Sequence, residues 1–102
     1  MKDLTYTEIA NKIKEEDIVV GKYYIAANID IFLSNGYGGL KNKYFDQICG
    51  LCYEAYIGSD ASLDEVVTAM RHLIDQKPLA DITLDDLYKK IAWLQYNNGE
   101  EY

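Results

Sequence analysis

The sequence predicts an all-α fold, a small bundle of four to five short helices. Apolar residues recur at intervals of three or four through most of the chain, as they do on the buried face of a helix. Three segments carry Ser or Thr with an acidic residue three positions later, which is the pattern of a capping box at a helix N-terminus. A length of 102 residues suits one domain, so residues 1–102 are expected to form a single helical domain.

The first helix is expected over residues 6–16. Thr5 and Glu8 form its capping box, in which each side chain satisfies a backbone N–H that the helix leaves unpaired. A narrow apolar stripe follows and ends in the polar run at residues 14–17, so this helix should be short.

The segment 18–36 fits two patterns. Some of its apolar residues alternate as in a β-strand, whereas an overlapping set repeats with the period of a helix. Its β-branched residues would also suit a β-hairpin that turns at residues 20–23. We predict a helix, because a run of this length that closes on Asn35-Gly36 is typical of a helix with a stop signal. Residues 37–39 are expected to form a loop.

The third helix is expected over residues 43–57 and contains both cysteines. Its apolar positions share one face: Phe45, Ile48, Cys49, Cys52, Tyr53 and Tyr56. Gly50 lies inside this helix, where glycine costs up to about 1 kcal/mol against alanine, and it suggests the close approach of another helix. The run Gly58-Ser59-Asp60 then ends the element.

The last two helices carry the clearest signals. Ser62 and Glu65 form the second capping box, and the helix that they open ends before Pro78, since proline disfavours helical geometry in the residue before it. Thr83 opens the last helix with two acids in the first turn, where the helix dipole favours negative charge. Asn and Gly at residues 97–99 end it.

The pair Cys49-x-x-Cys52 decides whether the chain is read as an enzyme. In a thioredoxin-like redox centre such a pair follows a buried strand and opens a helix, which lowers the pKa of a thiol. No strand pattern precedes the pair here, and both cysteines fall on the apolar face, where a thiol behaves as a small hydrophobic side chain. We predict two core residues and no enzyme. A thiol-dependent redox protein that uses Cys49 and Cys52 is the alternative.

No metal or cofactor is predicted. Zinc needs four ligands, whereas the chain offers two thiols and one histidine, His72, beside the apolar stripe of the fourth helix. The paired acids along the chain are typical of solvated helix faces. No nucleophile has both a base and an orienting partner that the sequence can identify.

Residues 4–10 resemble the opening helix of a helix-turn-helix module, which implies a DNA-binding regulator as a second alternative. The recognition helix would then run from Lys22 to Leu33. It offers one lysine and no arginine, whereas contacts with bases and phosphates need several cationic or amide donors. We therefore predict no direct binding of nucleic acid.

The charge of the chain indicates what kind of partner it meets. Seventeen acids against ten bases give a net charge of −7, which repels phosphate backbones and anionic lipid. No apolar leader and no membrane-spanning run is encoded, and two cysteines so close together suit reduced thiols. We expect a cytoplasmic protein with no membrane partner.

Ten tyrosines suggest how such a partner is bound, because tyrosine joins a rigid apolar ring to a polar tip that suits protein interfaces. We predict a non-enzymatic protein-interaction module that docks on another protein with a basic surface. In its sharpest form it is an inhibitor of a nucleic-acid-binding protein, of the kind that phages and mobile elements carry. A homo-oligomer is compatible with this reading. The predicted contact residues are Tyr23, Tyr37, Tyr96, Glu15, Glu16 and Asp17.

Overall fold

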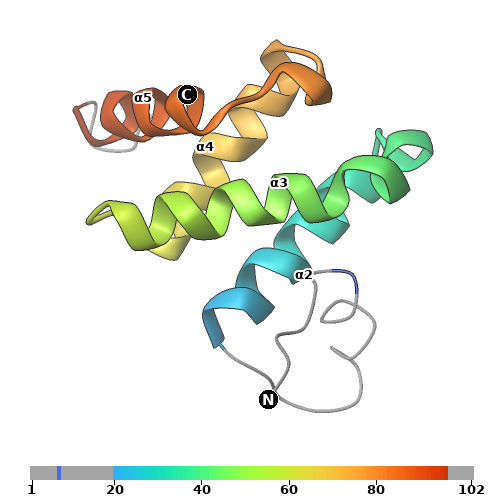
Figure 1. The fold of residues 1–102 in the computed structure, drawn as a ribbon, viewed down its shortest axis with the longest axis horizontal. Coiled ribbons are helices and arrows are strands. Elements are labelled where there is room, and N and C mark those ends of the chain that lie inside the picture. Colours follow the sequence, from blue (N-terminus) through green and yellow to red (C-terminus); the bar gives the residue numbers. More distant parts are fainter. Residues whose placement is uncertain (1–6, 8–19, 97–102) are drawn as a thin grey trace.

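The computed structural model of the chain describes Thr7 and residues 20–96. This part contains four α-helices and one 3₁₀ helix: α2 (Val20–Ser34), α3 (Gly38–Gly58), α4 (Leu63–Gln76), η1 (Leu79–Asp81) and α5 (Leu84–Tyr96) (Figure 1). The described residues include no strand, so the all-α prediction is confirmed and the hairpin alternative is wrong. The first predicted helix lies outside the described residues, except for Thr7.

Helix α3 is the element on which the others pack. It has 21 residues, about 30 Å of helix, and contacts α2, α4, η1 and α5. Figure 1 shows it crossing the middle of the molecule, with α2 on one side and α5 on the other. Its buried residues follow the predicted stripe: Phe45, Ile48, Cys49, Cys52 and Ala55. The two tyrosines of that stripe are half-buried.

One apolar cluster forms the core of the described residues, and every buried side chain in it is nonpolar. Beside the face of α3 just described, its largest fully buried members are Ile25, Ile29, Leu33, Val66, Val67, Met70, Leu87 and Leu94. Burying an aliphatic side chain of this size contributes about 1.5–3 kcal/mol, so α2, α4 and α5 are each held to the core by several such terms.

The start of α3 differs from the prediction, because the helix begins at Gly38 rather than at residue 43. The Tyr37 side chain makes no capping hydrogen bond, but its ring stacks on Phe32 with the centroids 5.9 Å apart. The Tyr37 N–H also donates to the Leu33 carbonyl oxygen at 2.8 Å. These contacts fix the turn between α2 and α3, so the glycine pair that was expected in a loop is drawn into the helix.

The starts of α4 and α5 agree with the sequence. Ser62 and Glu65 exchange backbone-to-side-chain hydrogen bonds of 2.9 and 3.1 Å, and Thr83 and Asp86 do the same at 3.0 and 3.1 Å. Helix α4 ends before the proline, as predicted. The short helix η1 between α4 and α5 has no counterpart in the prediction.

Within the described part of the chain, the glycine at a close helix approach is Gly58. A Cβ on Gly50 would meet nothing within 4 Å among the described residues. A Cβ on Gly58 would overlap the hydroxyl of Tyr88 on α5 and lie 3.3 Å from its Cζ. No described helix approaches Gly50, and Gly58 is the residue that lets the end of α3 approach α5.

Candidate functional site

The cysteine pair lies in the core rather than in a reactive site. The thiols of Cys49 and Cys52 are free, and both side chains are fully buried. Burial raises the pKa of both thiols, and the pKa of Cys49 is raised further by Cys52 and by the carboxylate of Asp46. Because the thiolate is the nucleophile, this environment disfavours thiol chemistry, and the assignment of both cysteines to the core is confirmed.

A metal site, a titrating histidine and a membrane-spanning helix are the other features that would indicate a function in the described residues. No three His, Cys, Asp or Glu side chains of residues 20–96 lie close enough together to hold a metal ion. Burial and the nearby Lys90 ammonium lower the pKa of the one histidine, His72, so this side chain favours the neutral form. None of α2 to α5 combines the length and the apolar content that crossing a bilayer requires.

The helix proposed to read DNA lies within α2, which packs on both α3 and α4. Ile25, Ala26, Ile29 and Leu33 bury one face of it in the core. Its single cation, Lys22, places its ammonium 5.1 Å from the centre of the Tyr53 ring. Helix α2 therefore offers no basic face to a DNA backbone.

The predicted contact tyrosines do not share one surface. Tyr23 lies near the start of α2 and Tyr37 follows its end, so about 17 Å of helix, from Tyr23 to Ser34, lies between them. The Tyr37 hydroxyl donates to Asp75 on α4 at 3.1 Å, a bond that raises the pKa of Tyr37 and ties the α2–α3 turn to α4. Tyr37 thus has a clear structural role. The predicted acids at positions 15–17 lie outside the described residues.

One end of the bundle brings together the start of α2, the end of α3 and the start of α4. A Cβ on Gly21 would lie 3.9 Å from the Tyr56 ring and 4.0 Å from Leu63. The Tyr24 hydroxyl donates to Asp64 at 3.2 Å, and burial, followed by this bond, raises the pKa of Tyr24. These contacts hold the first turns of α2 against the other two helices.

The end of α5 reaches the same part of the molecule. The side-chain amide of Gln95 donates to Asp60 at 3.4 Å and to Glu65 at 3.5 Å. Farther back along α5, Tyr88 lies against Gly58 at the end of α3. Figure 1 shows the last turns of α3 and α5 at the same side of the molecule.

These four helix ends carry exposed apolar side chains as well as exposed carboxylates. Tyr23 is 38% exposed, Ile57 64% and Tyr96 86%. The exposed acids beside them in the chain or in space are Glu54, Asp60 and Asp64. We call these six residues the tyrosine end: Tyr23, Glu54, Ile57, Asp60, Asp64 and Tyr96.

Sequence reasoning found two members of the tyrosine end and missed four. Ile57 could have been found, because it falls outside the period of the buried stripe on α3 and must therefore face another direction. The acids carry no such signal, since scattered exposed carboxylates are typical of any acidic surface. Their grouping appears only when helices distant in the sequence meet.

The geometry of this end offers a contact surface and no constellation of catalytic groups. Among the described residues, the tyrosine end contains no nucleophile paired with a base. Searches with this chain against protein-family models, curated proteins and solved structures return no match.

Proposed function

We propose that this protein is a non-enzymatic interaction module whose tyrosine end docks on a basic surface of another protein. The observation that carries the proposal is that contacts link the start of α2, the end of α3 and the end of α5 to the start of α4, and that these four helix ends carry three exposed apolar side chains and three exposed carboxylates. A few buried side chains, with tyrosine prominent among them, supply most of the affinity at protein interfaces, whereas charge speeds the encounter and selects the partner.

The net charge of −7 supports a partner with a basic surface. Carboxylates are attracted to the same lysines and arginines that bind phosphates, so a protein with a nucleic-acid channel is the partner that this surface suits best. Docking there would exclude the nucleic acid, and the sharpest form of the proposal is therefore an inhibitor. The short reach of charge in salt, about 10 Å at 0.1 M, requires direct contact.

The experiment uses the full chain as bait in extracts of its natural host, with bound proteins identified by mass spectrometry. The test variant combines Tyr23→Ala, Ile57→Ala and Tyr96→Ala, which removes the exposed apolar side chains of the tyrosine end and leaves the core intact. The matched control combines Ile31→Ala and Leu40→Ala, two exposed apolar residues that do not belong to this end. Circular dichroism checks that both variants are folded.

The expected result is a basic protein that the wild type and the control capture and the test variant does not. Loss of one interface anchor typically weakens binding about tenfold or more. The purified partner should be released by duplex DNA and by salt of about 0.5 M, because both compete for its basic surface. Capture that is equal for all three baits would disprove docking through this end, and release by salt but not by DNA would disprove inhibition.

A further inference from the structure

An open groove of about 250 Å³ lies between α4 and α5, and none of its lining residues belongs to the tyrosine end. Its lining residues are Leu73 from α4 and Asp86, Lys89, Lys90 and Trp93 from α5. Leu73 is buried and forms an apolar floor, whereas Trp93 is 46% exposed. A half-exposed tryptophan beside an apolar floor is the type of feature that anchors a bound segment.

The charges around this groove are unlike those of the molecule as a whole. Lys90 forms no ion pair with any described residue, and its ammonium lies 4.9 Å from the centre of the Trp93 ring. Lys89 pairs with Asp85 at 3.1 Å, but both side chains are about three-quarters exposed, so this pair is weak and readily exchanged.

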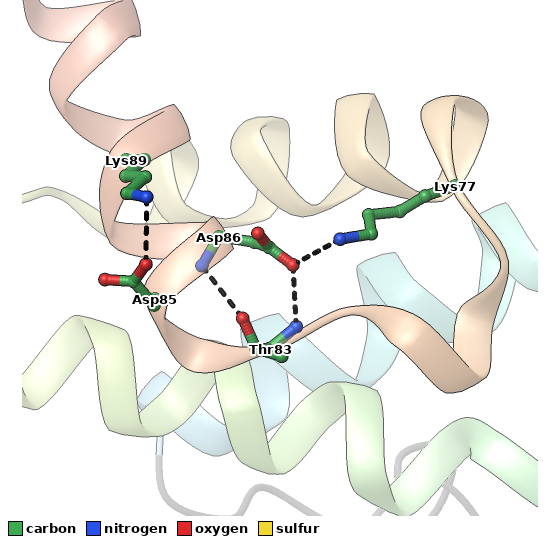
Figure 2. A network of polar contacts seen from close by, with 5 residues as sticks. All are labelled: Lys77, Thr83, Asp85, Asp86 and Lys89. Atoms are coloured by element: carbon green, nitrogen blue, oxygen red, sulfur yellow. Dashed lines mark hydrogen bonds and ion pairs between the residues drawn. The ribbon is translucent and has the colours of Figure 1, made fainter.

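The acid that lines the groove is already engaged. Figure 2 shows Asp86 accepting hydrogen bonds from Lys77, at 2.8 Å, and from the backbone N–H of Thr83, at 3.0 Å. Lys77 and Thr83 lower the pKa of Asp86 and hold its carboxylate ionised and in place. The Lys77 ammonium balances this charge, which leaves Lys90 and the exposed Lys89–Asp85 pair as the charges that a ligand in the groove would meet.

We propose that this groove binds a short acidic segment of a partner protein. An apolar side chain of that segment packs on Trp93 and Leu73, and flanking carboxylates meet the ammonium groups of Lys89 and Lys90. The lysines disfavour a basic segment in this place. Two lysines on a chain of charge −7 are too few to hold a nucleic-acid backbone, which depends on many phosphate contacts. Beyond a distance of about 10 Å, salt screens the repulsion between the chain and an acidic segment.

Trp93 makes the proposal directly testable, because it is the only tryptophan of the chain and its fluorescence reports on the groove. The probes are two blocked peptides of about eight residues without aromatic side chains. One contains Glu and Leu in equal number and the other contains Lys and Leu. The expected result is a saturable change of Trp93 emission with the acidic peptide and no such change with the basic one.

Matched variants separate local charge from total charge. Lys90→Glu and Lys43→Glu change the net charge equally, and each replaces a lysine that lies about 5 Å from a neighbouring aromatic ring. Lys90→Glu should weaken binding of the acidic peptide about tenfold or more, as expected when a contact charge is reversed, whereas Lys43→Glu should leave it within about twofold. Circular dichroism establishes that both variants fold.

Three results would overturn this inference: no saturable change of emission up to millimolar acidic peptide, an equal response to the basic peptide, or an equal loss in both variants. The triple alanine variant of the tyrosine end should bind the acidic peptide as the wild type does. Failure of the groove and failure of the tyrosine end are therefore distinguishable.

Discussion

Two glycines of α3, Gly50 and Gly58, differ in how closely other side chains approach them. Gly58 allows the Tyr88 hydroxyl to lie where a Cβ would be, and the Tyr88 ring packs against the core cluster and so has little freedom to move away. Gly50 faces open space among the described residues and lies in the interior of the helix. The same substitution should therefore have opposite effects at the two positions.

Gly58→Ala is expected to lower the free energy of unfolding by about 1–3 kcal/mol, the typical cost of forcing an extra methyl group into a packed contact. Gly50→Ala is expected to raise it by about 0.5–1 kcal/mol, because alanine restricts the unfolded chain and favours the helix. Urea unfolding followed by circular dichroism measures both values. Changes of the same sign in the two variants would contradict this account of the α3–α5 contact.

At the scale of the element, the start of α5 links charge to stability. Asp86 occupies the N3 position of the capping box, three residues after Thr83, and is also the ion-pair partner of Lys77, as Figure 2 shows. The hydrogen bond from Lys77 and that from the Thr83 backbone lower the pKa of Asp86. A carboxyl group with a lowered pKa in the folded state stabilises the fold above its unfolded pKa of about 3.9 and loses that contribution as the pH falls through its folded value.

Asp86→Asn is therefore expected to cost about 1 kcal/mol of unfolding free energy at pH 7, the usual size of a lost cap. The difference from the wild type should shrink as the pH falls from about 4 through the lowered pKa of Asp86, because the wild-type carboxylate then loses its charge. Urea titrations at pH 7, 4 and 3 measure this. Asp81→Asn, an exposed acid on η1, is the control and should show no comparable dependence. A difference that stays constant with pH would refute the role of the charge.

The elements that sequence predicted well are those whose boundaries depend on local chemistry. The capping boxes at Ser62 and Thr83 act within one helical turn, so α4 and α5 begin where the pattern placed them. The start of α3 was missed, because it depends on the contacts of Tyr37 with Phe32 and with Asp75 on another helix. Segment 18–36 satisfied both periodicities, and its described part forms the helix Val20–Ser34, which packs on α3 and α4.

At the scale of the whole molecule, the central position of α3 determines access to the thiols. Cys49 and Cys52 face a core to which α2, α4 and α5 all contribute, so no single helix can open them to solvent without disturbing the others. Reaction of these thiols should therefore require unfolding of the bundle as a unit.

Labelling with iodoacetamide is expected to be slow in the native state and fast in urea, with a native rate that increases when the fold is destabilised. Gly58→Ala should label faster than the wild type and Gly50→Ala more slowly, each by about tenfold for every 1.4 kcal/mol of change in the free energy of unfolding. Mass spectrometry of the labelled chain gives the rates. Rapid labelling of the folded protein at pH 6 would show an accessible thiolate and would restore the redox alternative.

The candidate site was harder to predict than the fold for a reason that also belongs to this scale. Tyr23 and Tyr96 fall outside, or at the edge of, the apolar stripes of the predicted helices, which is a local signal. Tyr37 gave the same signal, yet the structure places it at the other end of α2 with a hydrogen-bonded hydroxyl. Which of these three tyrosines lie in the same part of the molecule depends on how the helices cross, and the helix crossing cannot be read from any one segment.

Because α2, α4, η1 and α5 all contact α3, the positions at which the sequence can change during evolution are unevenly distributed. A replacement on the buried face of α3 alters its contacts with several helices at once, whereas a replacement of Tyr96, which is 86% exposed, alters few contacts. Substitutions of exposed residues on α2 and α5 can thus change the binding partner of the protein, in nature or by design, while its core stays the same.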